Sequence, residues 1–205
     1  LKKIGKSAFS YSHISGNLVL PEGLEDIGNS AFSNCYYLTG SLSIPQGIKV
    51  IKSGTFSGSG LDGNLILPKG LVEIGGSAFS NSGLRGELNI PSTVTIIGGS
   101  AFSGAKFSGT LVLPENLITL GSGAFYNCQW LTGIVEFPQN IVSIPSSIFS
   151  GCRNIEGVVL HKAIEVVEQN AFQNCYGITS IISEAKNPPL IASGAFSGVA
   201  KDNFA

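Results

Sequence analysis

Four cysteines are the residues of this 205-residue chain with the widest choice of chemistry, because a thiol can pair, bind a metal or attack a substrate. Each lies three residues after a phenylalanine, in the near-copies AFSNC, AFYNC, IFSGC and AFQNC that end at Cys35, Cys128, Cys152 and Cys175. The same place in other copies holds Ser12, Ser59, Ser82, Ala105 and Val199. These side chains are all small, and free cysteine behaves as a small buried hydrophobe. We therefore favour the interpretation that the cysteines are buried structural thiols.

A disulfide and a metal site are the alternatives for these cysteines. If successive copies stack, Cys128, Cys152 and Cys175 lie about 5 Å apart, which is within the Cα range of a disulfide. In-register side chains run parallel to one another, however, so a bridge needs a local shift. Structural zinc sites usually contain a closely spaced C-x₂₋₄-C pair, and the sequence has none. A disulfide stays open, and we predict no metal and no cofactor.

Histidines and carboxylates offer little for catalysis. His13 and His161 lie about six copies apart, hence roughly 30 Å at the strand spacing, so they cannot share a metal or a proton relay. The closest carboxylate pairs, Glu25–Asp26 and Glu165–Glu168, have the residue types of a glycoside hydrolase. Both pairs occupy repeat positions that we expect to face solvent. We predict that the chain is not an enzyme.

Composition excludes two classes of partner. The net charge is −1 and only 12% of the residues are charged, so no basic field exists to hold nucleic acid. Proline or glycine interrupts every apolar run before it reaches the ~18 residues of a membrane span, so we expect no membrane insertion. The chain opens within the repeat pattern, at LKKIGKSAF, without a leader. We interpret residues 1–205 as a single repeat domain from a longer protein.

An internal repeat runs through the whole sequence. Nine phenylalanines, each preceded by Ala, Thr or Ile, recur at spacings of 23 or 24 residues. Such a period is typical of solenoids, in which each copy buries its apolar face only against its neighbours. We call these residues the anchor phenylalanines: Phe9, Phe32, Phe56, Phe79, Phe102, Phe125, Phe149, Phe172 and Phe196.

Each copy predicts a strand and a turn. The L-x-L-P phrase alternates with period two, which favours a short strand ended by proline, and His161 takes the proline's place in one copy. The S-A-F-S-N phrase predicts one helical turn. A serine such as Ser30 is expected to cap its start, and Asn34 or Gly58 is expected to adopt the left-handed conformation at its end. The stacked strands should form a parallel sheet.

The combined phrase L-x-L-P-x-x-L-x-x-I-G-x-x-A-F-x-x-C-x-x-L resembles the BspA-type leucine-rich repeat over essentially the whole chain. The resemblance implies a β-rich solenoid: a right-handed leucine-rich repeat superhelix with a parallel β-sheet, short helical or 3-10 turns, and about nine repeats. It also implies a bacterial protein that is secreted or held at the cell surface, adheres to host matrix proteins or other cells, and has no catalytic motif. Residues 180–205 are expected to form a divergent last repeat, which we interpret as a cap.

Two sets of residues are candidates for partner contact. Residues between the inward apolar positions of each strand should point outward, and several are aliphatic, as at interaction surfaces. Trp130 and Tyr176 lie on the loop rim, and such aromatics are common at interface hot spots. The strand set, which we call the strand face, contains Val19, Ser43, Ile66, Asn89, Val112, Glu136 and Val159.

These features predict a non-enzymatic protein–protein interaction scaffold whose partner is a host matrix or cell-surface protein. Two alternatives stay open. The rim aromatics would suit a carbohydrate-binding module, with a glycan as the partner. A structural spacer within a surface protein would need no partner at all.

Overall fold

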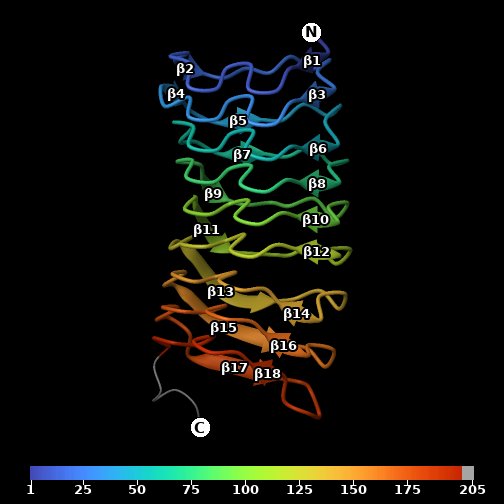
Figure 1. Ribbon diagram of the computed structural model, residues 1–205, viewed down its shortest axis with the longest axis vertical. Coiled ribbons are helices and arrows are strands. Elements are labelled where there is room, and N and C mark those ends of the chain that lie inside the picture. Colours follow the sequence, from blue (N-terminus) through green and yellow to red (C-terminus); the bar gives the residue numbers. More distant parts are fainter. Residues whose placement is uncertain (200–205) are drawn as a thin grey trace.

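A computed structural model describes residues 1–199 as a stack of coils with parallel strands (Figure 1). Paired residues in neighbouring coils lie 21 to 24 positions apart, for example Lys106 with Arg85 and Val166 with Leu190, so each repeat supplies one coil. The predicted solenoid is confirmed. Residues 200–205, the tail of the expected last repeat, lie outside the described part of the chain.

Some strands of the first row coincide with the predicted L-x-L-P phrases. Others lie a few residues before the phrase. In β9 and β11 the paired residues precede the phrase, whereas in β15 they include it. Hydrogen bonds from the Leu42 and Ile44 amides to the next coil show the parallel ladder. The row consists of β2 (Gly16–Asn17), β4 (Leu38–Thr39), β5 (Leu42–Ser43), β7 (Leu65–Ile66), β9 (Arg85–Glu87), β11 (Lys106–Thr110), β13 (Leu131–Glu136), β15 (Ile155–Leu160) and β17 (Ser180–Ser183).

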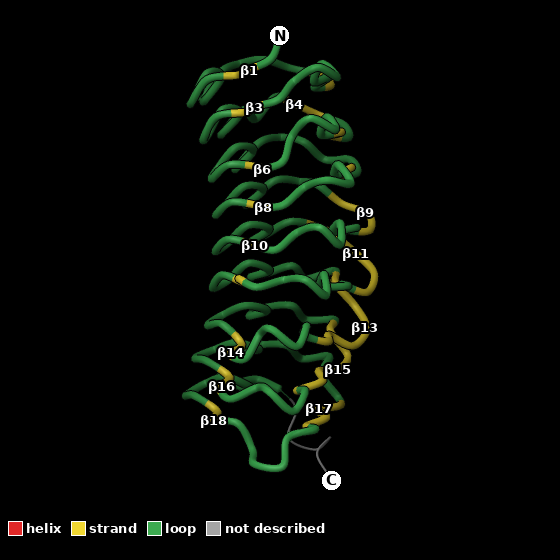
Figure 2. Tube along the Cα trace, turned by 90° about the vertical axis from the view of Figure 1, so that its right-hand side faces the viewer, coloured by secondary structure: helices red, strands yellow, loops and turns green. Residues whose placement is uncertain are grey.

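A second row of strands runs down another side of the stack (Figure 2). The sequence pattern marks only one apolar position there, because a strand of two residues has a single inward side chain and no visible alternation. That position is buried in most coils, as at Ile27 and Ile74. The row consists of β1 (Lys3–Ile4), β3 (Asp26–Ile27), β6 (Val50–Ile51), β8 (Glu73–Ile74), β10 (Ile96–Ile97), β12 (Thr119–Leu120), β14 (Ser143–Ile144), β16 (Val166–Val167) and β18 (Leu190–Ile191).

The anchor phenylalanines form one column through the core. Neighbouring rings are nearly parallel, with centroids 5.1 to 5.8 Å apart from Phe9 to Phe196. The rings from Phe32 to Phe172 are buried, whereas Phe9 in the first coil is 39% exposed. Because each ring packs between two others, the interior coils complete one another's core.

The predicted helical turn at S-A-F-S-N is wrong: residues 1–199 contain no helix. Ser30 has a φ of +55° and Asn34 has a φ of +56°, and a right-handed helix requires negative φ throughout. The amides instead alternate in direction. Those of Ala31 and Ser33 bond three residues back, whereas those of Phe32 and Asn34 bond to carbonyls of the next coil. Ser30 is therefore not a helix cap, and the left-handed conformations predicted for Asn34 and Gly58 are confirmed.

The last described coil continues the stack with an irregular connection. β17 pairs with β15 and β18 pairs with β16, and the Phe196 ring stacks on Phe172. Six residues, 184–189, separate β17 from β18, and they include Pro188 and Pro189. The departure of this repeat from the pattern is thus confined to one surface loop within residues 180–199.

Candidate interaction surfaces

The four cysteines are buried and unpaired, which confirms the interpretation as buried thiols. The Sγ atoms of Cys128, Cys152 and Cys175 lie 3.0 to 3.1 Å from the carbonyl oxygen of the anchor phenylalanine in the preceding coil, to which each thiol donates. Cys35 makes the same bond to Phe9 at 2.9 Å. Each thiol therefore joins two coils.

Burial also makes these thiols poor nucleophiles. It raises the pKa of Cys128 and of Cys175 to about 12, and it raises the pKa of Cys152 well above its ordinary value. The thiolate is the reactive form, so neutral buried thiols are inert. Among residues 1–199, no three or more His, Cys, Asp or Glu side chains gather closely enough to hold a metal ion.

The two histidines have unrelated environments. His13 is exposed and stacks on Tyr37, with ring centroids 5.5 Å apart. His161 is buried, and its Nδ1 accepts a bond from the Ala163 amide at 3.2 Å, which leaves Nε2 as the protonated nitrogen of the neutral ring. Within the described chain that Nε2 has no hydrogen-bond partner, and neither histidine bonds to a carboxylate.

The carboxylate pairs stabilise neighbouring coils. Glu25 pairs with Lys2 at 2.9 Å, and Asp26 lies between Lys3 and Lys52. Hydrogen bonds from Lys52 and Lys3 lower the pKa of Asp26. Glu168 accepts bonds from the Ser143 hydroxyl and the Ser146 amide, both at 3.0 Å. These contacts give Glu25, Asp26 and Glu168 structural partners in neighbouring coils.

The strand face lies on the outside of the first row of strands. Val19 is 78% exposed, Val112 is 71% exposed and Ile66 is 56% exposed. Ser43, Asn89 and Glu136 are also exposed, whereas Val159 is half-buried beside β17. Exposed aliphatic side chains thus recur on alternate coils along this side of the stack.

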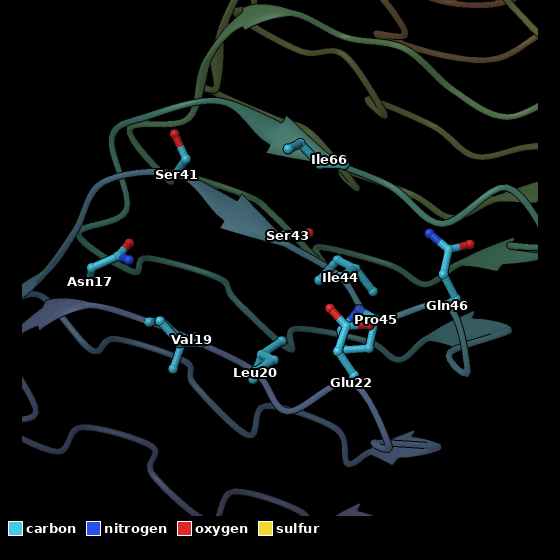
Figure 3. Close-up of a pocket in the computed structure, with 11 residues that line it drawn as sticks. Asn17, Val19, Leu20, Glu22, Ser41, Ser43, Ile44, Pro45, Gln46 and Ile66 are labelled. Atoms are coloured by element: carbon cyan, nitrogen blue, oxygen red, sulfur yellow. The ribbon is translucent and has the colours of Figure 1, made fainter.

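Shallow hollows follow this face between neighbouring coils. One, of about 320 Å³, is lined by Asn17, Val19, Ser43 and Ile66 among others (Figure 3). A second, of about 390 Å³, lies among Thr110, Val112, Ile134 and Glu136. Each hollow combines aliphatic side chains with hydroxyl, amide or carboxylate groups, as protein-binding surfaces do.

The rim aromatics lie on turns that directly follow cysteines. Trp130 is 58% exposed and Tyr176 is 54% exposed. Tyr36 and Tyr37 occupy the equivalent turn after Cys35 and are exposed as well. The sequence predicted these exposed aromatics on the loop rim but not the turn on which they lie. The spacing Cys-x-x-[Leu/Ile] in the cysteine-containing copies indicates that turn.

In the described residues, no helix is long and apolar enough to cross a membrane.

Three solved leucine-rich repeat proteins share the fold. The chain is 23% identical to one from Bacteroides ovatus (TM-score 0.58; 97% of this chain and 68% of that one covered). It is 19% identical to one from Eubacterium ventriosum (TM-score 0.53; 97% and 74%). It is also 19% identical to the T. pallidum protein TpLRR (TM-score 0.53; 91% and 78%).

Among curated proteins, the comparison finds no match. The family model for the BspA type leucine rich repeat region matches residues 1–108 and 86–201, which is nearly the whole chain. The matched segments contain the stacked anchor phenylalanines and the four buried cysteines. The chain therefore belongs to the BspA-type leucine-rich repeat family.

Proposed function

We propose that this chain is a non-enzymatic scaffold that binds a partner protein through the strand face. The exposed aliphatic side chains of Val19, Ile66 and Val112, which recur on alternate coils along one side of the stack, carry the proposal. Apolar side chains that recur on one exposed face, among polar ones, are typical of interaction surfaces. Because the coils are already ordered, binding would cost little conformational entropy.

We further propose that the parent protein is displayed at a bacterial cell surface or secreted, and that the partner is a host matrix or cell-surface protein. Membership of the BspA-type family supports this proposal. The low charge density of the chain favours a partner recognised by shape and apolar contact over one recognised by charge.

A binding screen of the purified chain against extracellular-matrix proteins tests the proposal. The double variant Ile66→Asp, Val112→Asp places two carboxylates on the strand face. We expect it to weaken binding to the partner at least about tenfold, a loss of about 1.4 kcal/mol in binding free energy, measured by biolayer interferometry.

The matched control changes the same residue types on another side. Val72 and Ile118 are exposed aliphatics beside the second row of strands, so Val72→Asp, Ile118→Asp adds the same charge away from the strand face. Equal loss in both variants would contradict a role for the strand face. Absence of saturable binding to every protein would favour the structural spacer.

A further inference from the structure

The cysteine-containing coils have a turn that the coils of Ser59, Ser82 and Ala105 lack. In those three coils one residue separates the small residue after the anchor from the next buried apolar residue, as Gly60 separates Ser59 from Leu61. In cysteine coils two residues intervene. The Leu131 amide donates to the Cys128 carbonyl at 3.3 Å, which closes a β-turn whose central residues project outward.

Three of these turns lie on consecutive coils, because Cys128, Cys152 and Cys175 are in register. They place aromatic, amide and guanidinium groups next to one another on the rim. The Arg153 guanidinium lies 6.0 Å from the centre of the Tyr176 ring, within the range of a cation–π contact. We call this patch the turn platform: Gln129, Trp130, Arg153, Asn154 and Tyr176.

Contacts within the turn platform orient its polar groups. The Asn154 amide donates to the Gln129 carbonyl oxygen at 2.9 Å, which ties one turn to the next. The Gln129 side-chain amide donates to Asn127 Oδ1 at 2.7 Å. These bonds leave the Asn154 and Gln129 side-chain oxygens able to accept bonds from a ligand.

The core does not require these aromatic side chains. Leu131 fills the inward position beside Trp130 and is 1% exposed, and Leu61 and Leu84 fill the same inward position in coils that have no aromatic turn. Trp130 instead leaves more than half of its surface in water. A large aromatic side chain held in that way on an ordered turn points to a ligand.

We propose that the turn platform binds the ring faces of a pyranose polysaccharide. The aromatic π-face is electron-rich and attracts the C–H groups on one face of a sugar ring, while amides bond to its hydroxyl groups. The turn positions contain no aliphatic side chain, in contrast to the strand face, and this difference favours sugar over protein. The inference does not depend on the function proposed for the strand face.

The spacing of the aromatics favours a chain of sugars over a single one. Trp130 and Tyr176 are two coils apart, so their backbones are separated by about 10 Å at the strand spacing. Lys106 precedes Gln129 by one coil, and neither Lys106 nor Arg153 belongs to an ion pair of residues 1–199. Lys106 and Arg153 are therefore available to pair with a sugar carboxylate bound at the turn platform.

Tryptophan fluorescence tests this inference directly, because Trp130 is the only tryptophan. The intact chain is titrated with a panel of pyranose hexasaccharides, some neutral and some built of uronic acids. We expect saturable change in Trp130 emission with at least one of them. Tyr176→Ala should raise the Kd of that hexasaccharide about tenfold. Because Trp130→Ala removes the fluorophore, its affinity is measured by calorimetry, which should show a similar or larger loss of affinity.

Two control variants separate the platform from general effects. Tyr11 is 68% exposed but lies outside the cysteine turns, so Tyr11→Ala should leave the Kd unchanged. Lys106→Gln should weaken binding of the uronic-acid hexasaccharides and leave binding of the neutral ones unchanged. This difference distinguishes a carboxylated from a neutral ligand. A chain that binds no hexasaccharide below about 10 mM, or whose Trp130→Ala variant keeps its Kd within about twofold, overturns the inference.

A protein partner provides the remaining outcome. If Trp130→Ala weakens binding of a matrix protein while no hexasaccharide binds, the turn platform is a protein epitope and the glycan inference is wrong. The Ile66→Asp, Val112→Asp variant tests only the strand face, so failure of one proposal is distinguishable from failure of the other.

Discussion

At the residue scale, the most informative contacts are those between a side chain and the backbone of the preceding coil. The four thiols donate to anchor carbonyls 26 or 27 residues earlier in the chain. Serine in the same position of other coils bonds differently: Ser82 donates to the carbonyl of Phe79 in its own coil. Cysteine therefore has a linking role that its small size alone does not reveal.

The cysteines should resist alkylation in the folded chain. Burial raises the pKa of Cys128 and Cys175 to about 12, so the thiolate fraction stays very small when the pH rises from about 8 to about 10. We expect iodoacetamide to modify none of the four cysteines under native conditions and all four in denaturant, as measured by mass spectrometry. Rapid native labelling that follows the pH would contradict this account.

His161 should be replaceable by proline with a gain in stability. Proline occupies the equivalent place in six other coils, and the buried His161 Nε2 has no partner in the described chain. Removing an unsatisfied polar atom and restricting the unfolded chain should raise the free energy of unfolding by about 1 kcal/mol. Urea denaturation measures the change. His161→Ala, which leaves a cavity, is the control and should lower stability.

At the scale of the element, coils approach each other so closely that some positions admit only glycine. A Cβ atom on Gly121 would lie 2.2 Å from the backbone nitrogen of Gly99 in the preceding coil, and one on Gly98 would lie 2.4 Å from that of Gly76. The close approach allows the Gly121 amide to bond to the Ile97 carbonyl at 2.8 Å. These glycines therefore serve coil packing.

Gly121→Ala should destabilise the chain by about 2–3 kcal/mol, because the backbone of the preceding coil must move to admit the methyl group. Thermal denaturation measures the loss. A methyl group on Gly23 would meet no atom within 4 Å, so Gly23→Ala is the matched control and should change stability little. Equal effects of the two substitutions would show that coil approach does not limit these positions.

At the scale of the whole molecule, stability comes from contact between neighbouring coils along one continuous column. Each interior anchor ring stacks on two others, whereas Phe9 stacks on Phe32 alone and is 39% exposed. In such a stack the stability of a repeat depends on its own packing and on its two interfaces. The cost of a core substitution should therefore depend on its place along the stack.

Phe102→Ala should lower the free energy of unfolding by about 3–5 kcal/mol, because it opens a cavity between Phe79 and Phe125. Phe9→Ala should cost less than half as much, because the ring is partly in water and has one stacking partner. Urea denaturation of both variants under the same conditions checks the ratio. Similar losses for the two positions would contradict a stack stabilised by neighbours.

The sequence alone determined the solenoid, the anchor column and the outward direction of most of the strand face. These features are local and periodic, so residue types at fixed spacings report them directly. Val159 was expected outside and is half-buried, because its exposure depends on the adjacent coil.

Only the tertiary structure decided how the coils join. The second row of strands, the left-handed serines and the thiol bonds all depend on hydrogen bonds between residues more than twenty positions apart. Such bonds form only when the coils stack, and no local pattern encodes them. The same stacking brings three cysteine turns together as the turn platform, because each turn alone carries only one or two outward side chains.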